Sequence, residues 1–306
     1  MVSVTILLSS YNHQVFIDEA IVSVINQSYQ DWELWVLDDA STDGTIEKLK
    51  IWEAKDQRIN LFLSKANLGK ARQLNKVLNK ISTPYTAFLD SDDHWHPEKL
   101  QQQINVLEKN EGIGLVFTDG YVVDSRPLVV KQKDKAWKND LHDKRFSEAH
   151  RTPPLQHGNM FTALLHGNFI FYSSVLFRSK YLEEVAFQTE INRSMDWLFW
   201  IEMAQQTKFW YIKEPLAYYR VHGKNLQNKV NTSDSKYAAS LFVMETYGKH
   251  IESATKHKYL YIAGLDNWKN NRFELAKKQL REALRYRSNH WKSWVLLLAA
   301  SLHIKF

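Results

Sequence analysis

Short apolar runs alternate with segments of helical periodicity along residues 2–119, and this alternation limits the possible folds more than any other feature. It predicts βαβ units, in which helices flank a mainly parallel sheet. Each predicted strand ends in polar residues, and open sheets of this α/β class bind ligands beyond the carboxyl ends of their strands. The strands are predicted at residues 4–8, 32–37, 59–63, 85–89 and 113–117, and the helices near 14–27, 43–55, 69–80 and 97–109.

Three carboxylates follow the fourth predicted strand within four residues, at Asp90, Asp92 and Asp93. Carboxylates this close repel one another unless a cation, a hydrogen-bond donor or water offsets the repulsion. Mg²⁺ and Mn²⁺ prefer carboxylate oxygens and keep coordination positions open for phosphates. The run therefore indicates either a metal-diphosphate site or a solvated acidic turn before the helix that Pro97 opens.

Residues 125–158 interrupt the alternation with polar, basic and proline residues, which indicates either a lid or a surface insertion. Its histidines, His142, His150 and His157, lack the close spacing of a helical metal site, so we assign them no metal.

Regular patterns return after this insertion. Residues 168–185 predict a strand that leads into a helix, and another helix is predicted to begin at Asp196. Residues 208–212 and 216–221 predict a pair of β-strands around Pro215.

The chain is helical from about residue 233 onward, so we divide it into a catalytic domain, residues 1–228, and a helical region, residues 229–306. The small and apolar residues of this region resemble a single tetratricopeptide-type helix pair. One such pair cannot bury its own face, and it is expected to pack on the catalytic domain, a partner or a membrane. The residues that carry this resemblance are Gly264, Ala276, Leu280 and Ala283.

The amino-acid composition bears on the location of the protein in the cell and on its ligands. The absence of cysteine excludes disulfides and thiolate metal sites and is compatible with a cytoplasmic location. We expect no signal peptide, because a strand begins at once, and no membrane span, because the apolar residues 294–302 fall short of the ~20 that a span needs. The net charge of +6 fits an anionic ligand or lipid surface, and no nucleic-acid partner is expected.

The C-terminal residues allow two interpretations, an interfacial membrane anchor at the inner face of the membrane or a terminal helix that faces the core. The residues concerned are Trp291, Lys292, Trp294, the leucine run 296–298 and Lys305.

Four motifs lie at residues 9–12, 38–45, 67–75 and 90–92, and three shorter ones follow at residues 167–170, 196–197 and 219–222. Their order and spacing resemble the family 2 glycosyltransferases with the GT-A fold, over roughly residues 1–225. Residues 9–12 resemble the P-x-Y-N turn of that family, with Ser9 in the place of proline. Residues 38–45 resemble D-D-x-S-x-D-G-T, residues 67–75 resemble N-x-G-x-x-x-A-x-N, and residues 90–92 resemble D-x-D. The resemblance implies the nucleotide-diphospho-sugar transferase fold, with an added helical region.

The resemblance also implies the roles of individual residues. Asp39 is expected to accept a hydrogen bond from a uracil-type N–H, with capping of the following helix as its alternative. Asp92 is the expected ligand of Mn²⁺ or Mg²⁺, with His222 as a second ligand, whereas Asp93 is either a ligand or a cap. The expected nucleotide-sugar residues are Ser10, Tyr11, Asp39, Asn67, Gly69, Arg72, Asp90 and Ser91.

Asp196 matches the catalytic base of inverting members, although Met195 stands where an acid is usual. We therefore expect an inverting hexosyl- or N-acetylhexosaminyltransferase that uses a nucleotide-diphosphate sugar, UDP-linked by preference. Its acceptor would be a hydroxyl of a glycan or lipid-linked saccharide in cell-surface polysaccharide synthesis.

Two other functions remain open at this point. A nucleotidyltransferase also builds a metal-carboxylate site on an α/β sheet, but no glycine-rich, basic triphosphate loop follows the first strand. A catalytically impaired sugar-nucleotide-binding or scaffold protein would be compatible with Met195.

Overall fold

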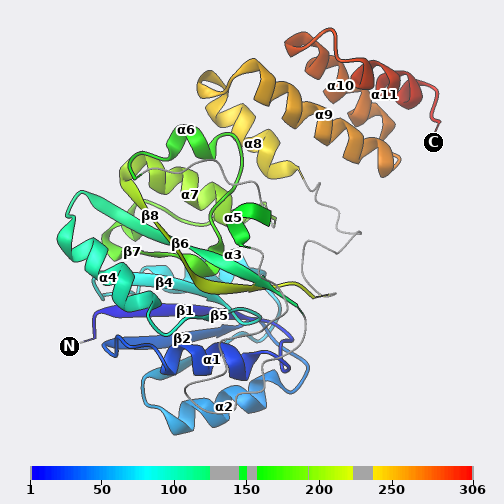
Figure 1. Ribbon diagram of the computed structural model, residues 1–306. Helices are drawn as coiled ribbons and strands as arrows, with labels where there is room; N and C mark the ends of the chain where they lie inside the picture. Colours follow the sequence, from blue (N-terminus) through cyan, green and yellow to red (C-terminus); the bar gives the residue numbers. More distant parts are fainter. Residues whose placement is uncertain (1, 125–144, 150–156, 192, 223–236, 305–306) are drawn as a thin grey trace. The chain divides into compact units, whose positions relative to one another are not determined.

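The computed structural model of the chain describes residues 2–124, 145–149, 157–191, 193–222 and 237–304 (Figure 1). His142, His150, Lys305 and the predicted domain boundary at residues 228 and 229 lie outside the described residues.

An eight-stranded mixed sheet forms the centre of the fold, in the order β3-β2-β1-β4-β7-β6-β8-β5. The pairs β1–β2, β1–β4, β2–β3 and β6–β8 are parallel, and the pairs β4–β7, β6–β7 and β5–β8 are antiparallel. The strands are β1 (Val4–Ser10), β2 (Trp32–Asp38), β3 (Ile59–Leu63), β4 (Tyr85–Asp90), β5 (His94–Trp95), β6 (Ile113–Val123), β7 (Leu176–Arg178) and β8 (Lys208–Arg220).

Helices follow the first three strands and β5, as the alternation predicts. Helices of the first half are α1 (Ile17–Ile25), α2 (Thr45–Lys55), α3 (Lys70–Leu78) and α4 (Lys99–Lys109). Those after them are α5 (Phe146–Ala149), α6 (Phe161–Leu164), α7 (Met195–Gln206), α8 (Ala238–Tyr247), α9 (Ser253–Lys269), α10 (Phe273–Tyr286) and α11 (Trp291–Ser301).

The core forms where the inner strands meet α1. Every residue of β1 is buried, as expected for a central strand that is covered on both faces. In α1, Ile17, Ala20, Ile21 and Val24 recur at helical spacing and are fully buried, so this helix presents one apolar stripe to the sheet.

The second half of the sheet departs from the sequence prediction. The predicted pair of strands around Pro215 is wrong, because β8 runs unbroken through Pro215. The register between β6 and β8 shifts where Asp119 lies opposite Pro215, since proline has no N–H for the ladder and a bulge accommodates it. Likewise, only Leu176–Arg178 of the segment 168–185 forms a strand, and 3₁₀ turns flank it.

The chain forms two compact units. Unit 1 holds the sheet and comprises Met1–Met160, Phe169–Phe187 and Glu202–Asn228, and unit 2 comprises Phe161–Asn168, Gln188–Ile201 and Lys229–Phe306. In unit 2, α9 and α10 approach closely at Gly264, where a Cβ atom would lie 2.7 Å from Cγ of the buried Leu280. The C-terminal helices are therefore present, while their tetratricopeptide character stays a prediction. Among the helices of the described residues, none is long and apolar enough to cross a membrane.

Candidate active site

The carboxyl ends of β1, β2 and β4 meet at one edge of the sheet in unit 1. Ser10 pairs with Asp38 at the end of β2, and Ser9 pairs with Asp90 at the end of β4. The loops after these strands therefore start side by side, which brings the predicted nucleotide and metal residues together.

Asp38 and Asp43 shape the loop between β2 and α2. Asp38 accepts hydrogen bonds from the backbone N–H and the hydroxyl of Ser41, at 2.8 and 2.6 Å. Asp43 accepts the backbone N–H of Thr45 at 3.0 Å, where α2 begins. Of these two residues, Asp43 bonds to the start of α2, and the carboxylate of Asp39 accepts hydrogen bonds from another loop, so the capping alternative for Asp39 is not what the structure has.

Asp39 instead holds the loop that follows β3. Its two carboxylate oxygens accept the backbone N–H groups of Leu68 and Gly69, both at 2.8 Å, and its side chain is nearly buried. Gly69 has a φ of +84°, a conformation that side-chain-bearing residues rarely adopt, and it opens α3. Each carboxylate oxygen retains a second lone pair, so Asp39 can still accept a hydrogen bond from a ligand.

The remaining predicted nucleotide residues differ in exposure. Tyr11 is 40% exposed, and Asn67 and Arg72 are also exposed. By contrast, the Ser10 hydroxyl is buried and has no hydrogen-bond partner within the described part of the chain. A buried hydroxyl without a partner is costly, which makes Ser10 a candidate donor to a ligand at the end of β1.

Asp90 forms an ion pair with Lys70, a residue that the sequence analysis missed. The Lys70 ammonium also lies 3.3 Å from the ring centre of Tyr172. Burial raises the pKa of Asp90, against the lowering effect of Lys70. Lys70 lies directly after Gly69, but nothing in the sequence indicates that its side chain reaches the end of β4.

Asp93 is held from two sides by the protein. Its carboxylate accepts the Ser173 hydroxyl at 2.6 Å and the backbone N–H of Arg220 at 3.0 Å. Burial, followed by the charges of Asp92 and Asp90, raises the pKa of Asp93 well above its ordinary value. Of the three neighbouring acids, Asp93 is therefore the one most firmly tied to the protein's own structure.

Asp92 lies with two histidines in a cluster whose ligand atoms are all within 4.8 Å of one another. His222 Nε2 is 2.9 Å from Asp92 Oδ2, and His13 Nδ1 is 2.7 Å from the hydroxyl of Ser91. Burial alone would raise the pKa of Asp92, but the hydrogen bond from His222 and the charge of His13 hold it below its ordinary value.

This cluster fits a divalent metal ion. One carboxylate and two imidazoles are donors that suit first-row transition ions. The Ser91 contact leaves Nε2 of His13 as the ring nitrogen for coordination, and metal-ligating histidines usually engage their other nitrogen in this way. Sequence reasoning found Asp92 and His222 but missed His13, whose only signal was its position directly after the residue 9–12 motif.

Arg220 stabilises the turn that carries Asp92 and Asp93. Its side chain is 1% exposed, and its Nε donates to the backbone carbonyl of Asp92 at 2.9 Å. Its Nη2 donates to Glu19 on α1 at 2.6 Å. Because Arg220 also holds Asp93 through its backbone, one buried residue on β8 fixes both ends of the Asp92–Asp93 segment.

Asp196 belongs to unit 2, in the first turn of α7. Its Oδ2 accepts a hydrogen bond from the side-chain amide of Asn168 at 2.9 Å. The neighbouring Trp197 is buried and donates to the backbone carbonyl of Leu164 at 2.8 Å, so it is part of the core of this unit. The catalytic role of Asp196 stays a prediction.

Comparison with protein families decides the class of this chain. Residues 5–185, more than half of it, match the family model "Glycosyl transferase family 2". The chain belongs to glycosyl transferase family 2. This confirms the family resemblance of the four sequence motifs.

Two curated relatives are similar in sequence to this family 2 glycosyltransferase. It is 27% identical over 262 residues to an uncharacterized glycosyltransferase of Methanocaldococcus jannaschii, covering 84% of this chain and 83% of the relative. It is 38% identical over 128 residues to the UDP-Glc:alpha-D-GlcNAc-diphosphoundecaprenol beta-1,3-glucosyltransferase WfgD of Escherichia coli, covering 42% of this chain and 49% of WfgD.

Solved structures resemble the family 2 glycosyltransferase in fold at low sequence identity. Residues 1–349 of S. aureus TarS in complex with UDP-GlcNAc align with a TM-score of 0.64 at 14% identity, covering 98% of this chain and 88% of that one. A mannosyltransferase from Pyrobaculum calidifontis in complex with GDP-Man and Mn²⁺ aligns with a TM-score of 0.54 at 16% identity, covering 98% and 86%. The predicted GT-A fold is thereby confirmed.

Proposed function

We propose that this chain is an inverting glycosyltransferase that moves a hexosyl or N-acetylhexosaminyl group from a UDP-sugar to a hydroxyl of a glycan or lipid-linked saccharide. The observation that carries the proposal is the convergence of Asp39, Asp90, Asp92 and His222 at adjoining strand ends of a family 2 chain. UDP as the nucleotide is supported by the names of WfgD and of the TarS complex, which refer to UDP-sugars. The name of WfgD, which gives GlcNAc-diphosphoundecaprenol as the acceptor, supports a lipid-linked acceptor. A role in polysaccharide synthesis is supported by two further relatives, which are named for teichuronic acid biosynthesis in Bacillus subtilis and amylovoran biosynthesis in Erwinia amylovora.

The nucleotide is bound by residues of β1, β2 and the loop before α3. Asp39 accepts the N–H of the uracil with the lone pairs that Leu68 and Gly69 leave unused. Tyr11, which follows Ser10 in the sequence and has an exposed side chain, lies against the base. Asp90 accepts a ribose hydroxyl while Lys70 balances its charge.

A divalent metal, Mn²⁺ or Mg²⁺, would be held by Asp92 and His222, with His13 as a third ligand. Bound there, it supplies positive charge for the departing diphosphate. Ser91 orients the ring of His13, and Arg220 holds the backbone of Asp92 in place.

Asp196 removes the proton of the acceptor hydroxyl as the oxygen attacks the anomeric carbon of the donor. The new carbon–oxygen bond forms as the bond to the diphosphate oxygen breaks, and the bonding electrons leave with UDP. Attack opposite to the leaving group inverts the anomeric configuration. Because Met195 cannot orient the base, Asn168 takes that role through its hydrogen bond to Asp196.

The enzyme would work in the cytoplasm, with peripheral association at the inner face of the membrane. Product analysis with a panel of UDP-sugars, saccharide acceptors and Mn²⁺ tests the reaction itself. Release of UDP together with a glycosylated acceptor is expected. In a parallel assay with UTP and sugar 1-phosphates, release of pyrophosphate would show a nucleotidyltransferase instead. Donor binding without turnover on any acceptor would show a sugar-nucleotide-binding protein.

A further inference from the structure

The outer face of α11 is apolar and exposed. Its inner face packs Leu296, Ala299 and Ala300 into a core cluster with α10. The opposite face carries large apolar side chains at helical spacing, which we name the α11 stripe. The members of the stripe and their exposed fractions are Trp291 at 66%, Trp294 at 54%, Val295 at 44%, Leu298 at 62% and Leu302 at 59%.

The positive charge of the protein is concentrated in the same part of the chain. Residues 253–306 contain 11 of the 40 lysines and arginines but only three of the 34 acidic residues, which gives this segment a formal net charge of +8. The whole chain has a net charge of +6, so the rest of it is slightly acidic. Such segregation points to an anionic partner for the C-terminal helices.

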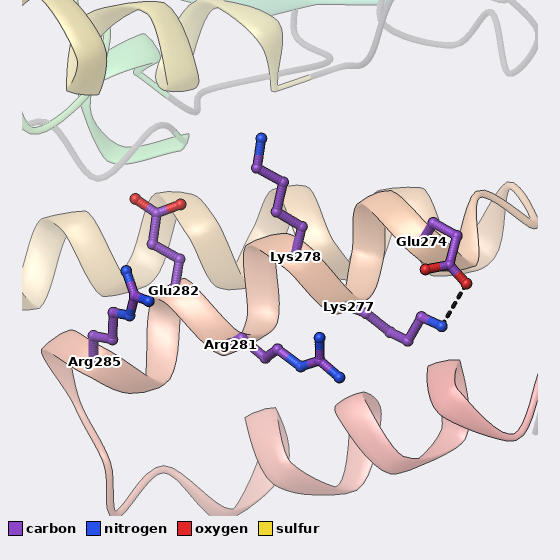
Figure 2. Close-up of a pocket in the computed structure, with 6 residues that line it drawn as sticks. All are labelled: Glu274, Lys277, Lys278, Arg281, Glu282 and Arg285. Atoms are coloured by element: carbon purple, nitrogen blue, oxygen red, sulfur yellow. Dashed lines mark ion pairs between the residues drawn. The ribbon is translucent and has the colours of Figure 1, made fainter.

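The helix next to α11 displays these cations on an open surface. A hollow of about 360 Å³ lies along α10 and is lined by four cations and two acids (Figure 2). Of the residues drawn, only Lys277 and Glu274 form an ion pair. Lys278, Arg281 and Arg285 are exposed at successive turns of the helix, and we name these three the α10 basic row.

We propose that the α11 stripe and the α10 basic row form a docking surface for an anionic lipid bilayer. The stripe would enter the boundary between headgroups and acyl chains, and the basic row would contact lipid phosphates. This inference deepens the peripheral membrane association of the proposed function, on which it rests, by naming the surface that makes it. It uses none of the residues of the strand-end site, so it can fail or hold independently of sugar transfer.

Two features favour a bilayer over a protein partner. Two tryptophans stand in the stripe, and the indole ring, apolar with one polar N–H, prefers the membrane interface. Protein interfaces are typically depleted of lysine at their core, whereas here the Lys292 ammonium lies 5.7 Å from the ring centre of Trp291. An apolar helix face combined with clustered cations is the combination that binds anionic membrane surfaces.

Vesicle flotation of the full chain tests the proposal. We expect the protein to float with vesicles of phosphatidylcholine and phosphatidylglycerol and to remain unbound with phosphatidylcholine alone. High salt should reduce the bound fraction, because the phosphate contacts are electrostatic and screened.

Paired variants separate the two parts of the surface. The double substitution Trp291→Ser and Leu298→Ser should weaken binding by about tenfold or more. Lys278→Glu with Arg281→Glu should do the same and should remove the preference for phosphatidylglycerol. Matched controls on unit 1, Ile51→Ser for exposed apolar area and Lys50→Glu with Lys109→Glu for charge, should float like the wild type.

Three results would overturn the proposal. The first is absence of wild-type binding to phosphatidylglycerol vesicles, and the second is equal loss in the matched controls. The third is a dimer in light scattering that the Trp291 and Leu298 substitutions dissociate, since a second copy would then cover the stripe. Calorimetric UDP binding by each variant, expected to equal that of the wild type, shows that a loss of flotation is not a failure of folding or of the nucleotide site.

Discussion

Three aspartates in one tight turn have three different environments in this protein. Asp90 is paired with Lys70, Asp92 lies with His13 and His222, and Asp93 is bound by Ser173 and the Arg220 backbone. Mutual repulsion is offset differently at each carboxylate, so the turn can present negative charge at Asp92 while Asp93 serves the structure.

Replacing Asp196 by Asn tests the proposed base. The variant should transfer sugar about 10² to 10⁴-fold more slowly, because a positioned general base contributes about that much. Its affinity for UDP should be unchanged, since Asp196 is not among the expected nucleotide residues. Steady-state transfer rates and UDP titrations measure both quantities. A variant that transfers at the wild-type rate would contradict the assignment.

Replacing His13 by Ala tests the third metal ligand. We expect Mn²⁺ affinity to fall by at least about tenfold, the loss typical of groups that orient or complete a metal site. Paramagnetic resonance of free Mn²⁺ measures binding directly and does not depend on turnover. His303→Ala, an exposed histidine of unit 2, is the control and should bind Mn²⁺ like the wild type. Equal affinity in the His13 variant would remove His13 from the metal set.

The pairing of β6 with β8, in the second half of the sheet, requires the two strands to approach closely at Gly120. A Cβ atom at Gly120 on β6 would lie 2.7 Å from the backbone carbonyl oxygen of Ala217 on β8. Gly120→Ala should therefore lower the free energy of unfolding by about 1–3 kcal/mol, the usual cost of overpacking. Gly112→Ala, where a Cβ would meet nothing within 4 Å, should leave it nearly unchanged in the same denaturant titration.

Helix α4 begins with a fully buried lysine. The Lys99 ammonium donates to the Gln103 side chain at 2.8 Å and to the Val175 carbonyl at 3.2 Å, with no carboxylate among these two partners. Burial lowers the pKa of Lys99 well below its ordinary value of 10.5. Between the folded and the unfolded pKa the unfolded chain therefore holds one more proton than the folded chain.

This difference sets the sign of a pH effect. Because the unfolded state binds the extra proton, Lys99 makes the free energy of unfolding rise with pH up to about 10.5, by roughly 1.4 kcal/mol per pH unit. Denaturant titrations of the wild type and Lys99→Met over alkaline pH should show this rise only in the wild type. Parallel curves for the two proteins would show that Lys99 keeps its ordinary pKa.

An element can be predicted from the sequence when its residue pattern is local, and it cannot when it depends on contacts with residues far away in the sequence. Residues 2–119 were predictable because buried strands and amphipathic helices leave local patterns, such as the run of apolar residues in the buried strand β1 and the apolar stripe of α1. β8 was not, because proline normally ends a strand, whereas here the long pairing with β6 continues on both sides of Pro215 and a register shift at Asp119 accommodates it. The site shows the same division: Asp92 and His222 stand in recognisable motifs, whereas Lys70 and His13 join it only through folding.

At the scale of the whole molecule, each of the two units carries a surface of a different chemical kind. Unit 1 carries the strand-end carboxylates and histidines, and the C-terminal helices of unit 2 carry an excess of positive charge and an exposed apolar stripe. An enzyme that extends lipid-linked saccharides needs both chemistry on a nucleotide sugar and a place at the lipid surface. The proposed function and the proposed docking surface are consistent with that need but are tested separately.

Calorimetric titration of UDP into the full chain, with and without Mn²⁺, tests the central claim most directly. We predict strong binding with Mn²⁺ and a loss of at least about tenfold when the metal is removed or Asp92 is replaced by Asn, because Asp92 would hold the ion and the ion would supply positive charge for the diphosphate. UDP binding that is equally strong without metal, or unchanged by Asp92→Asn, would contradict the account of the strand-end site.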